Sequence, residues 1–305
     1  MGKRVFFDRI GSQEIDISVV IVTFNNRFTI GRCVETLTRF MSPLQVELIL
    51  IDNASSDGTR SILEEIDRRR HSDFASLTVL FNSQNLGYTR AVNQGLVLCR
   101  GKLVLLLNPD IEFVAPILTT LTALFARCEI VACAPQLRYP DGKIQPSCRR
   151  FPIKRDILFE VLGLSRLFPH SAFFNRWRMP DFAHDHSCAV EQPQGAFLLI
   201  RRSVMQTVGP LDERFPMFFS DVDLCRRLYQ HGVIWFCSEG YVVHLKGVSV
   251  HQVRDRMIVS SHRSFADYFS KYDQKKRQAA VTLLIRFVLL CALPIRLAAV
   301  VLQKR

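Results

Sequence analysis

The sequence predicts an α/β fold in which a mostly parallel sheet is flanked by helices, and three observations support this class. First, apolar and β-branched runs at 17–24, 46–52, 77–82 and 103–107 are typical of buried strands. Second, a segment with helical spacing of apolar residues follows each of the first three runs. Third, this alternation of strands and helices is the pattern of right-handed βαβ units, whose strands lie parallel.

The sequence predicts where each of the helices between these strands begins. The spacing of three apolar residues predicts a helix after the first strand: Ile30, Val34 and Leu37. The polar turn at 53–58 can cap a second helix that begins near Thr59. A third helix is expected to open at Asn85 and to reach about Cys99.

After Asp110 the pattern changes, and the expected elements become shorter. Residues 149–187 have no clear period and are interpreted as a substrate-facing excursion rather than a core element. Ser220 is the expected N-cap of a helix that opens near Phe218 and ends before Gly232. The other expectations are a helix over 115–127, a hairpin with arms at 131–139 and 143–145, a strand over 195–200, a helix over 202–208, and strands over 233–236 and 241–244.

Charge is unevenly distributed along the 305 residues, whose formal net charge is +12. Residues 254–305 carry eleven Lys/Arg against three acids, and residues 138–178 carry nine against three. A basic tail on a nearly neutral body indicates an anionic partner such as a membrane leaflet or nucleic acid. The nine cysteines are odd in number and scattered, which is typical of reduced thiols in a cytosolic protein.

The apolar C-terminal stretch at 279–302 resembles a membrane span at first sight. Arg286 and Arg296 interrupt it, and Pro294 lies between them. Its longest charge-free run, 287–295, is shorter than the roughly twenty residues that a spanning helix needs. An interfacial amphipathic helix, or a pair of helices broken at the proline, is therefore favoured. A single span and a soluble core or dimer helix are the alternatives.

Polar groups follow three of the predicted parallel strands, and they are expected to meet at one edge of the sheet, where ligands bind in such folds. They are Thr23 to Asn25, Asp52 and Asp110. The first strand is not followed by a glycine-rich phosphate loop, so a bound diphosphate would need another counter-charge. A divalent cation held by Asp110 would supply it. The alternative for either aspartate is a local turn-capping role.

Six motifs resemble those of the family-2 glycosyltransferases of the GT-A fold, and within them the bacterial rhamnosyltransferase-like branch. They occur in the family's order over about residues 17–250: Val22-Thr23-Phe24-Asn25, Asp52-Asn53-Ala54-Ser55-Ser56-Asp57-Gly58-Thr59, Asn85-Leu86-Gly87-Tyr88 with Asn93-Gln94-Gly95, Leu107-Asn108-Pro109-Asp110, Phe219-Ser220-Asp221-Val222-Asp223-Leu224, and His244-Leu245-Lys246-Gly247.

The resemblance implies a role for each matching residue. Asp110 would coordinate a Mg²⁺ or Mn²⁺ ion with His244, and Asp221 would be the base that deprotonates the acceptor hydroxyl. Many relatives have Glu before this Asp, whereas this chain has Ser220, so Asp223 is kept as the second choice. Gly195 and Asp223 are assigned to the acceptor side. The nucleotide-sugar side would comprise Thr23, Asn25, Asp52, Asn53, Asn85, Gly87, Asn93 and Asn108.

Each of these roles has a structural alternative. Asp221 and Asp223 could be favourable first-turn acids of a helix, and His244 could be a hydrogen-bonded core histidine. The basic pairs around Arg149 and Arg178 could be solvated charge or could hold a lipid-linked diphosphate.

The implied function is inverting, metal-dependent transfer of a sugar from a nucleotide-diphosphate sugar, with dTDP-rhamnose as a candidate donor. The acceptor would be a lipid-linked glycan or polysaccharide in bacterial cell-surface glycan synthesis. Residues 1–253 would form the catalytic domain, with a nucleotide-sugar half at about 15–112 and an acceptor half at 113–253, and residues 254–305 would form the helical membrane-associating region.

This arrangement predicts a peripheral or monotopic protein on the cytoplasmic face of the bacterial inner membrane, in contact with its anionic surface. A nucleic-acid partner is not expected, because no recognition motif is present. The oligomeric state stays open, with a homodimer among the alternatives. The alternative function is a nucleotide-sugar-binding scaffold at the membrane whose chemistry is degraded.

Overall fold

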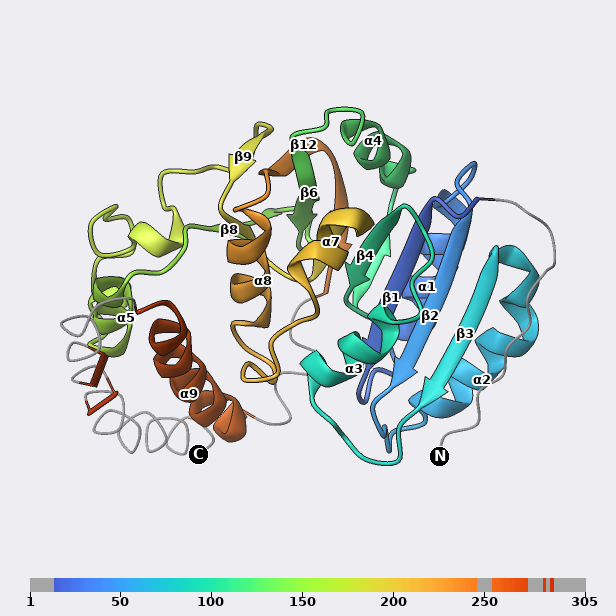
Figure 1. Cartoon of the computed structure of the whole chain (residues 1–305), viewed down its shortest axis with the longest axis horizontal. Coiled ribbons are helices and arrows are strands. Elements are labelled where there is room, and N and C mark those ends of the chain that lie inside the picture. The colour runs from blue at the N-terminus through green and yellow to red at the C-terminus, as the bar shows by residue number, and fades with distance from the viewer. Residues whose placement is uncertain (1–13, 246–253, 274–281, 284–285, 288–305) are drawn as a thin grey trace.

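A ten-stranded sheet forms the centre of the computed structural model, which describes residues 14–245, 254–273, 282–283 and 286–287 (Figure 1). Its main path runs β3-β2-β1-β4-β11-β6-β12-β5, with β7 beside β6 and β9 beside β12. The strands of this sheet are β1 (Ile17–Thr23), β2 (Val46–Asp52), β3 (Ser76–Phe81), β4 (Leu103–Leu107), β5 (Ile111–Phe113), β6 (Ile130–Arg138), β7 (Ile144–Gln145), β9 (Cys188–Val190), β11 (Phe197–Arg201) and β12 (Val233–His244). A separate two-stranded sheet pairs β8 (Cys148–Arg149) with β10 (Gln192–Pro193).

Helices cover both faces of the large sheet (Figure 1). They are α1 (Ile30–Phe40), α2 (Thr59–Arg70), α3 (Tyr88–Leu96), α4 (Ile117–Leu124), α5 (Lys154–Val161), α6 (Leu164–Leu167), α7 (Arg202–Val208), α8 (Ser220–Leu228) and α9 (Arg254–Tyr272), with short 3₁₀ helices η1 (His71–Asp73) and η2 (Arg176–Arg178).

The first half of the chain confirms the predicted parallel sheet. β1 pairs in parallel with both β2 and β4, and β2 pairs in parallel with β3. All residues of β1, β2 and β4 are buried, because helices pack on both faces of these strands. Val19 and Ile21 belong to the apolar cluster that includes α1, α2 and α4, whereas Val20 and Val22 belong to the cluster that includes α3, α7 and α8. This alternation follows from the two-residue period of a strand.

The second half of the chain adds antiparallel strands, whose positions in the sheet were not predicted from the sequence. β11 lies between β4 and β6 and runs antiparallel to both, with Phe197 opposite Leu107. The start of β11 therefore lies where β4 ends. β12 pairs antiparallel with β5, which places His244 opposite Ile111. The sheet is thus mixed, and these antiparallel pairs deliver distant residues to the edge where the parallel strands end.

Three local expectations differ from the structure. Ser220 is the first residue of α8, and Phe219 occupies the N-cap position with a φ of 70°. The two short strands expected at 233–236 and 241–244 are one irregular strand, β12, because its pairing with β6 continues beyond a register shift between Cys237 and Tyr241. The segment 149–187, interpreted as an excursion without core elements, contains α5, whose Ile157 is fully buried.

Within residues 254–305, α9 packs against the region of α5 and α8 (Figure 1). Phe265 and Tyr268 of α9 share an apolar cluster with Phe219, Val222 and Ile157. No helix among the residues that the structure describes is long and apolar enough to cross a membrane. The predicted helix pair around Pro294 lies outside the described residues, so the amphipathic tail and the boundary at 253 stay predictions.

The eight cysteines in the described part of the chain carry free thiols, as predicted. Five of them are buried: Cys33, Cys133, Cys148, Cys225 and Cys237.

We expect Gly95→Ala to destabilise the fold, because α3 packs closely on the sheet at this position. A Cβ atom at residue 95 would lie 2.6 Å from Cγ1 of Val20 and 3.0 Å from Cδ1 of Ile51. Overpacking of this kind costs about 1–3 kcal/mol of unfolding free energy, which urea denaturation would measure. Gly31→Ala is the matched control, because its new Cβ would meet its nearest neighbour, Ile62, at 3.8 Å. Equal stability of the two variants would contradict the prediction.

Candidate active site

Thr23 and Asp52 lie side by side at the carboxyl ends of β1 and β2, as predicted. The Thr23 hydroxyl donates to Oδ1 of Asp52 over 3.2 Å, and the backbone N–H of Ser55 donates to Oδ2 over 3.1 Å. Asp52 is buried, with 2 % of its surface exposed. The turn-capping role that was the alternative for Asp52 is therefore present, while contact with a nucleoside stays a prediction.

Asparagine side chains tie together the loops at this edge. Oδ1 of Asn25 accepts from the backbone N–H of Ser56 over 2.9 Å and so joins the loops after β1 and β2. Asn53 donates over 2.9 Å to Oδ1 of Asn85, which also accepts the N–H of Gly87. These amides hold the loops after β1 and β2 and the loop before α3 in one arrangement.

Asn93 has a different role from these loop residues. Its amide nitrogen donates to the carbonyl of Leu211 over 2.9 Å, and its amide oxygen accepts from the N–H of the same residue over 2.9 Å. Both polar atoms of the side chain thus clamp α3 to the segment before α8. The structure gives Asn93 a structural function, and donor binding by this residue stays a prediction.

The two predicted metal ligands, Asp110 and His244, are brought together by the pairing of β5 with β12. The N–H of Leu245 donates to the carbonyl of Asp110 over 3.0 Å, and Nε2 of His244 lies 3.4 Å from Oδ1 of Asp110. Among the residues that the structure describes, no group of three or more His, Cys, Asp and Glu could hold a metal ion. Asp110 and His244 therefore place a carboxylate oxygen and a ring nitrogen side by side, and both are atoms of kinds that can bind a metal ion.

A buried glutamine orients the histidine of this pair. Nδ1 of His244 lies 2.8 Å from Oε1 of Gln145, which can only accept a hydrogen bond. Nδ1 therefore carries a ring proton, and Nε2 faces the carboxylate of Asp110. The neutral ring presents the lone pair of Nε2 beside this carboxylate, whereas the doubly protonated ring forms an ion pair with it. Histidine ligands of metals are commonly held in this way by a second hydrogen bond.

Two backbone hydrogen bonds connect the loop of Asp110 to Asp221. The N–H of Asn108 donates to the carbonyl of Ala196 over 2.9 Å, and the N–H of Gly195 donates to Oδ2 of Asp221 over 3.1 Å. Gly195 leaves room for this contact, because a Cβ atom there would lie 2.8 Å from Cβ of Asp221. The expected acceptor-side residue Gly195 thus positions the expected base.

Asp221 is half-buried, and its carboxylate is held by donors on both oxygens. Oδ2 also accepts from Nε2 of Gln192 over 3.3 Å, and Oδ1 accepts from the N–H of Val222 over 2.9 Å. Burial raises the pKa of Asp221 above its usual value, while the N–H groups of Gly195 and Val222 and the nearby charge of Arg149 act in the opposite direction. An acid with this balance can exchange a proton closer to neutral pH than an ordinary aspartate.

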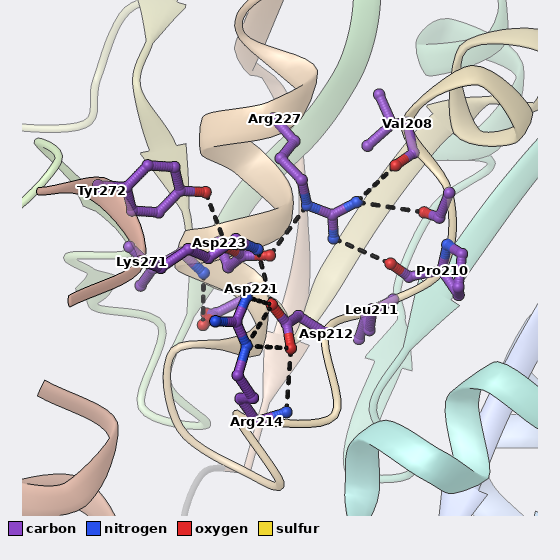
Figure 2. Close-up of polar contacts among 12 residues, drawn as sticks. Val208, Pro210, Leu211, Asp212, Arg214, Asp221, Asp223, Arg227, Lys271 and Tyr272 are labelled. Carbon is purple, nitrogen blue, oxygen red and sulfur yellow. Dashed lines mark hydrogen bonds and ion pairs between the residues drawn. The ribbon is translucent and has the colours of Figure 1, made fainter. Parts of the chain in front are cut away.

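Asp223 lies in a different environment, although it is only two residues away on α8. Figure 2 shows its carboxylate between three donors: Lys271 Nζ at 2.5 Å, the Tyr272 hydroxyl at 2.7 Å and Arg227 Nε at 2.9 Å. Its exposed fraction is zero. Residues two apart on a helix point to nearly opposite sides, because each residue turns the helix by about 100°. Asp223 therefore faces α9, while Asp221 faces Gly195.

The cluster around Asp223 extends to the segment before α8 (Figure 2). Arg227 donates to the carbonyls of Val208 and Pro210, at 2.8 and 3.0 Å. Lys271 also pairs with Asp212 at 2.8 Å, and Arg214 holds the pKa of Asp212 well below its usual value. This network joins α8, α9 and the loop that Asn93 clamps.

The basic pairs near Asp221 are partly neutralised, contrary to the interpretation as solvated charge. Arg176 pairs with Asp156 at 3.2 Å, Arg178 pairs with Glu160 at 2.7 Å, and Arg150 lies 3.6 Å from Asp181. Arg149 has only carbonyl oxygens as partners in the described part of the chain, and burial lowers its pKa.

Sequence reasoning missed Gln145 and Gln192, which contact the predicted metal ligand His244 and the predicted base Asp221. Both lie in strands of two residues, and neither belongs to one of the six motifs. A glutamine in such a context carries no signal in a single sequence, because its partners are more than 25 residues away along the chain.

Comparisons with known proteins show a family and a set of relatives for this chain. The profile of "Glycosyl transferase family 2" matches residues 18–184. The chain is 28% identical over 249 residues to an N-acetylglucosaminyl-diphospho-decaprenol L-rhamnosyltransferase of Mycobacterium tuberculosis, covering 75% of this chain and 78% of that protein. It is 22% identical over 262 residues to a low-salt glycan biosynthesis hexosyltransferase of Haloferax volcanii, covering 84% and 74%.

A solved structure shows the same fold. The mannosyltransferase of Pyrobaculum calidifontis in complex with GDP-Man and Mn²⁺ superposes with a TM-score of 0.58 at 17% identity, covering 94% of this chain and 76% of that one. The GT-A-like α/β fold expected from the six motifs is thereby confirmed.

We expect Asp223→Ala to lower stability strongly, because it would leave Arg227 without its buried carboxylate partner and Lys271 with Asp212 alone. Breaking a buried ion cluster in this way costs about 3–5 kcal/mol of unfolding free energy, measurable by urea denaturation. The control is Asp141→Ala, which removes an exposed pair with Lys143 and should change stability by less than about 0.5 kcal/mol. An unchanged unfolding midpoint for Asp223→Ala would show that the cluster does not hold α9.

Proposed function

Because the chain belongs to glycosyl transferase family 2, and is therefore a glycosyltransferase, we propose that it transfers a sugar with inversion from a nucleotide-diphosphate sugar to a lipid-linked or polysaccharide acceptor. The observation that carries this proposal is the convergence at one sheet edge of the Asp110–His244 pair and the buried acid Asp221. We propose rhamnose from dTDP-rhamnose as the transferred sugar, because the similar mycobacterial protein is an L-rhamnosyltransferase that acts on a lipid-diphosphate-linked sugar.

In this proposal Asp221 is the catalytic base. A hydroxyl of the acceptor loses its proton to the carboxylate as its oxygen attacks the anomeric carbon, and the bond from that carbon to the nucleoside diphosphate breaks. The donors Gly195 and Gln192 hold one carboxylate oxygen in place. The N–H of Gly195 also favours the ionised form and so opposes the rise in the pKa of Asp221 that burial causes. Asp223 is unsuited to this role, because all its contacts are with Arg227, Lys271 and Tyr272.

Asp110 and His244 would hold a divalent cation, Mg²⁺ or Mn²⁺. The fixed tautomer of His244 and the adjacent carboxylate form a nitrogen–oxygen donor pair that suits such an ion. When bound, the cation supplies positive charge that stabilises the departing diphosphate. The solved mannosyltransferase with the same fold contains Mn²⁺ together with its nucleotide sugar, which supports this assignment.

The nucleotide would lie over the ends of β1 and β2. Thr23, Asn25, Asp52, Asn53, Asn85, Gly87 and Asn108 all belong to the loops that meet there. Asp52 would approach the nucleoside, although its carboxylate already accepts two hydrogen bonds within the protein. The half-buried Arg149 has no carboxylate partner in the described residues, and it would contact the diphosphate of a lipid-linked acceptor.

We also propose that the protein works at the cytoplasmic face of the bacterial inner membrane. A lipid-linked acceptor lies in a bilayer, and the mycobacterial relative is named for such a substrate. The excess of eleven basic over three acidic residues in 254–305 would draw this end of the chain to an anionic surface.

We expect Asp221→Asn to abolish sugar transfer while leaving donor binding intact, because the amide cannot accept the proton. General-base removal typically costs about 10²–10⁴-fold in rate, measured as metal-dependent release of nucleoside diphosphate from dTDP-rhamnose. Thermal stabilisation by the donor with Mn²⁺ should be unchanged. If the unsubstituted chain bound the donor but turned over none, the alternative of a degraded scaffold would be supported.

The pH profile of the same assay checks the identity of the base. Since burial raises the pKa of Asp221, the rate should fall with decreasing pH at values above the usual 3.8 of aspartate. Arg149→Gln removes a positive charge that favours the ionised form, so it should move this acid limb to higher pH. If the acid limb of the pH profile did not move in Arg149→Gln, the effect of the Arg149 charge on the pKa of Asp221 would be contradicted.

We expect Asp110→Asn to weaken binding of Mn²⁺ and donor together, because the amide supplies no negative charge to the cation. Loss of a ligand interaction of this kind should reduce metal affinity by at least about tenfold, measured by calorimetric titration of Mn²⁺ in the presence of dTDP. Gln145→Leu, which frees His244 to rotate, should give a smaller loss. Glu112→Gln is the matched control, and an equal effect there would exclude a specific site.

A further inference from the structure

A cluster of exposed apolar side chains lies at the end of α5, on α6 and in the loop that follows α6. Its outer members are Leu162, Leu167, Phe168 and Phe173, with exposed fractions of 59, 69, 44 and 54%. We call these four residues the apolar cap. Exposed apolar residues grouped in this way are a mark of an interaction surface.

The apolar cap is firmly built. Phe174 stacks on Phe168 with a centroid separation of 4.8 Å and meets Phe173 edge-on at 5.1 Å. The buried amide of Asn175 donates to the carbonyls of Ser165 and Phe168, at 2.7 and 2.8 Å. The loop is therefore held by specific contacts that keep its apolar side chains at the surface.

Positive charge accompanies the apolar cap. Residues 149–178 contain seven Lys/Arg against two acids, and four of these basic residues are in ion pairs: Arg150, Lys154, Arg176 and Arg178. Arg155 stacks on Phe173 at 4.4 Å, and the exposed Arg166 precedes Leu167 and forms no ion pair within the described part of the chain. Apolar side chains surrounded by arginines are the composition of segments that lie in the interface of an anionic bilayer.

The apolar cap shares one end of the molecule with the C-terminal region. Lys154 at the start of α5 pairs with Asp273 at 2.7 Å, and the hydroxyl of Thr282 donates to the same carboxylate. Next to this junction, Leu283 and Phe287 are exposed by 67 and 65%. Figure 1 shows α5 and α9 at the end opposite to β3 and α2.

We propose that the apolar cap docks the protein onto an anionic lipid bilayer, as a second attachment point beside the C-terminal region. Its position also orients the enzyme: Ile157 of α5 packs in one cluster with Phe219 and Val222, which flank Asp221. Docking on this side would turn the acceptor half to the bilayer, a consequence that rests on the proposed use of a lipid-linked acceptor. A second copy of the chain fits less well, because Arg155 and Arg166 would be buried against their own duplicates.

The test uses the full chain and sedimentation with phosphatidylcholine vesicles that contain or lack phosphatidylglycerol. Replacing Leu167, Phe168 and Phe173 together by Ser should lower partitioning onto the anionic vesicles by about tenfold or more. The matched control replaces Phe28 and Val97, exposed by 77 and 85% in the nucleotide half, by Ser. The control should bind as the unsubstituted chain does, and thermal unfolding should confirm that both variants fold.

Two outcomes would overturn the proposal. One is equal vesicle binding by the triple variant and the unsubstituted chain, which would leave attachment to the C-terminal region alone. The other is a dimer in solution that the triple variant dissociates without any change in vesicle binding, which would make the apolar cap a contact between copies. Vesicle binding needs no donor and no acceptor, so its failure is distinct from failure of sugar transfer in the Asp221 experiment.

Discussion

The site depends on the antiparallel placement of β11 beside β4. A parallel strand would begin at the opposite edge of the sheet, but β11 begins where β4 ends. Its first residues can therefore bind both the loop after β4 and the start of α8. Ala196 accepts the N–H of Asn108, and Gly195 donates to Asp221. Residues more than 100 positions apart in the chain are thus held at one edge, by a backbone hydrogen bond at Ala196 and by the bond from the N–H of Gly195 to the carboxylate of Asp221. The missing Cβ of Gly195 makes room for the second contact.

The two acids at the start of α8 show how helix geometry separates chemistry from structure. Asp221 retains a half-buried carboxylate whose donors are mainly backbone N–H groups and an amide, so its charge is stabilised without a direct ion pair. Asp223 is enclosed by Lys271, Tyr272 and Arg227 and fastens α9 to α8. The absence of an ion pair at Asp221 among the described residues supports the proposal that it is the base, because a strong buried ion pair would make it a poor proton acceptor.

The apolar cap and the acceptor side of the site lie on one structural unit. α5, α8 and α9 share a single apolar cluster, and the ion pair between Lys154 and Asp273 closes its outer end. A surface that attaches this unit to a bilayer would thus fix the orientation of Asp221 relative to the lipids.

The sequence alone was sufficient for the elements and chemistry that depend on local patterns. The bounds of β2, β4 and α7 were predicted closely, because runs of buried residues and helical spacing are visible within one segment. The motifs around Asp110, Asp221 and His244 were recognised for the same reason. The tertiary structure decided what depends on distant partners: the order of β11 and β12 in the sheet, the contacts of Gln145 and Gln192, and the different environments of Asp221 and Asp223. Those outcomes follow from which side of a strand or helix meets which neighbour, and that is settled only when the chain packs.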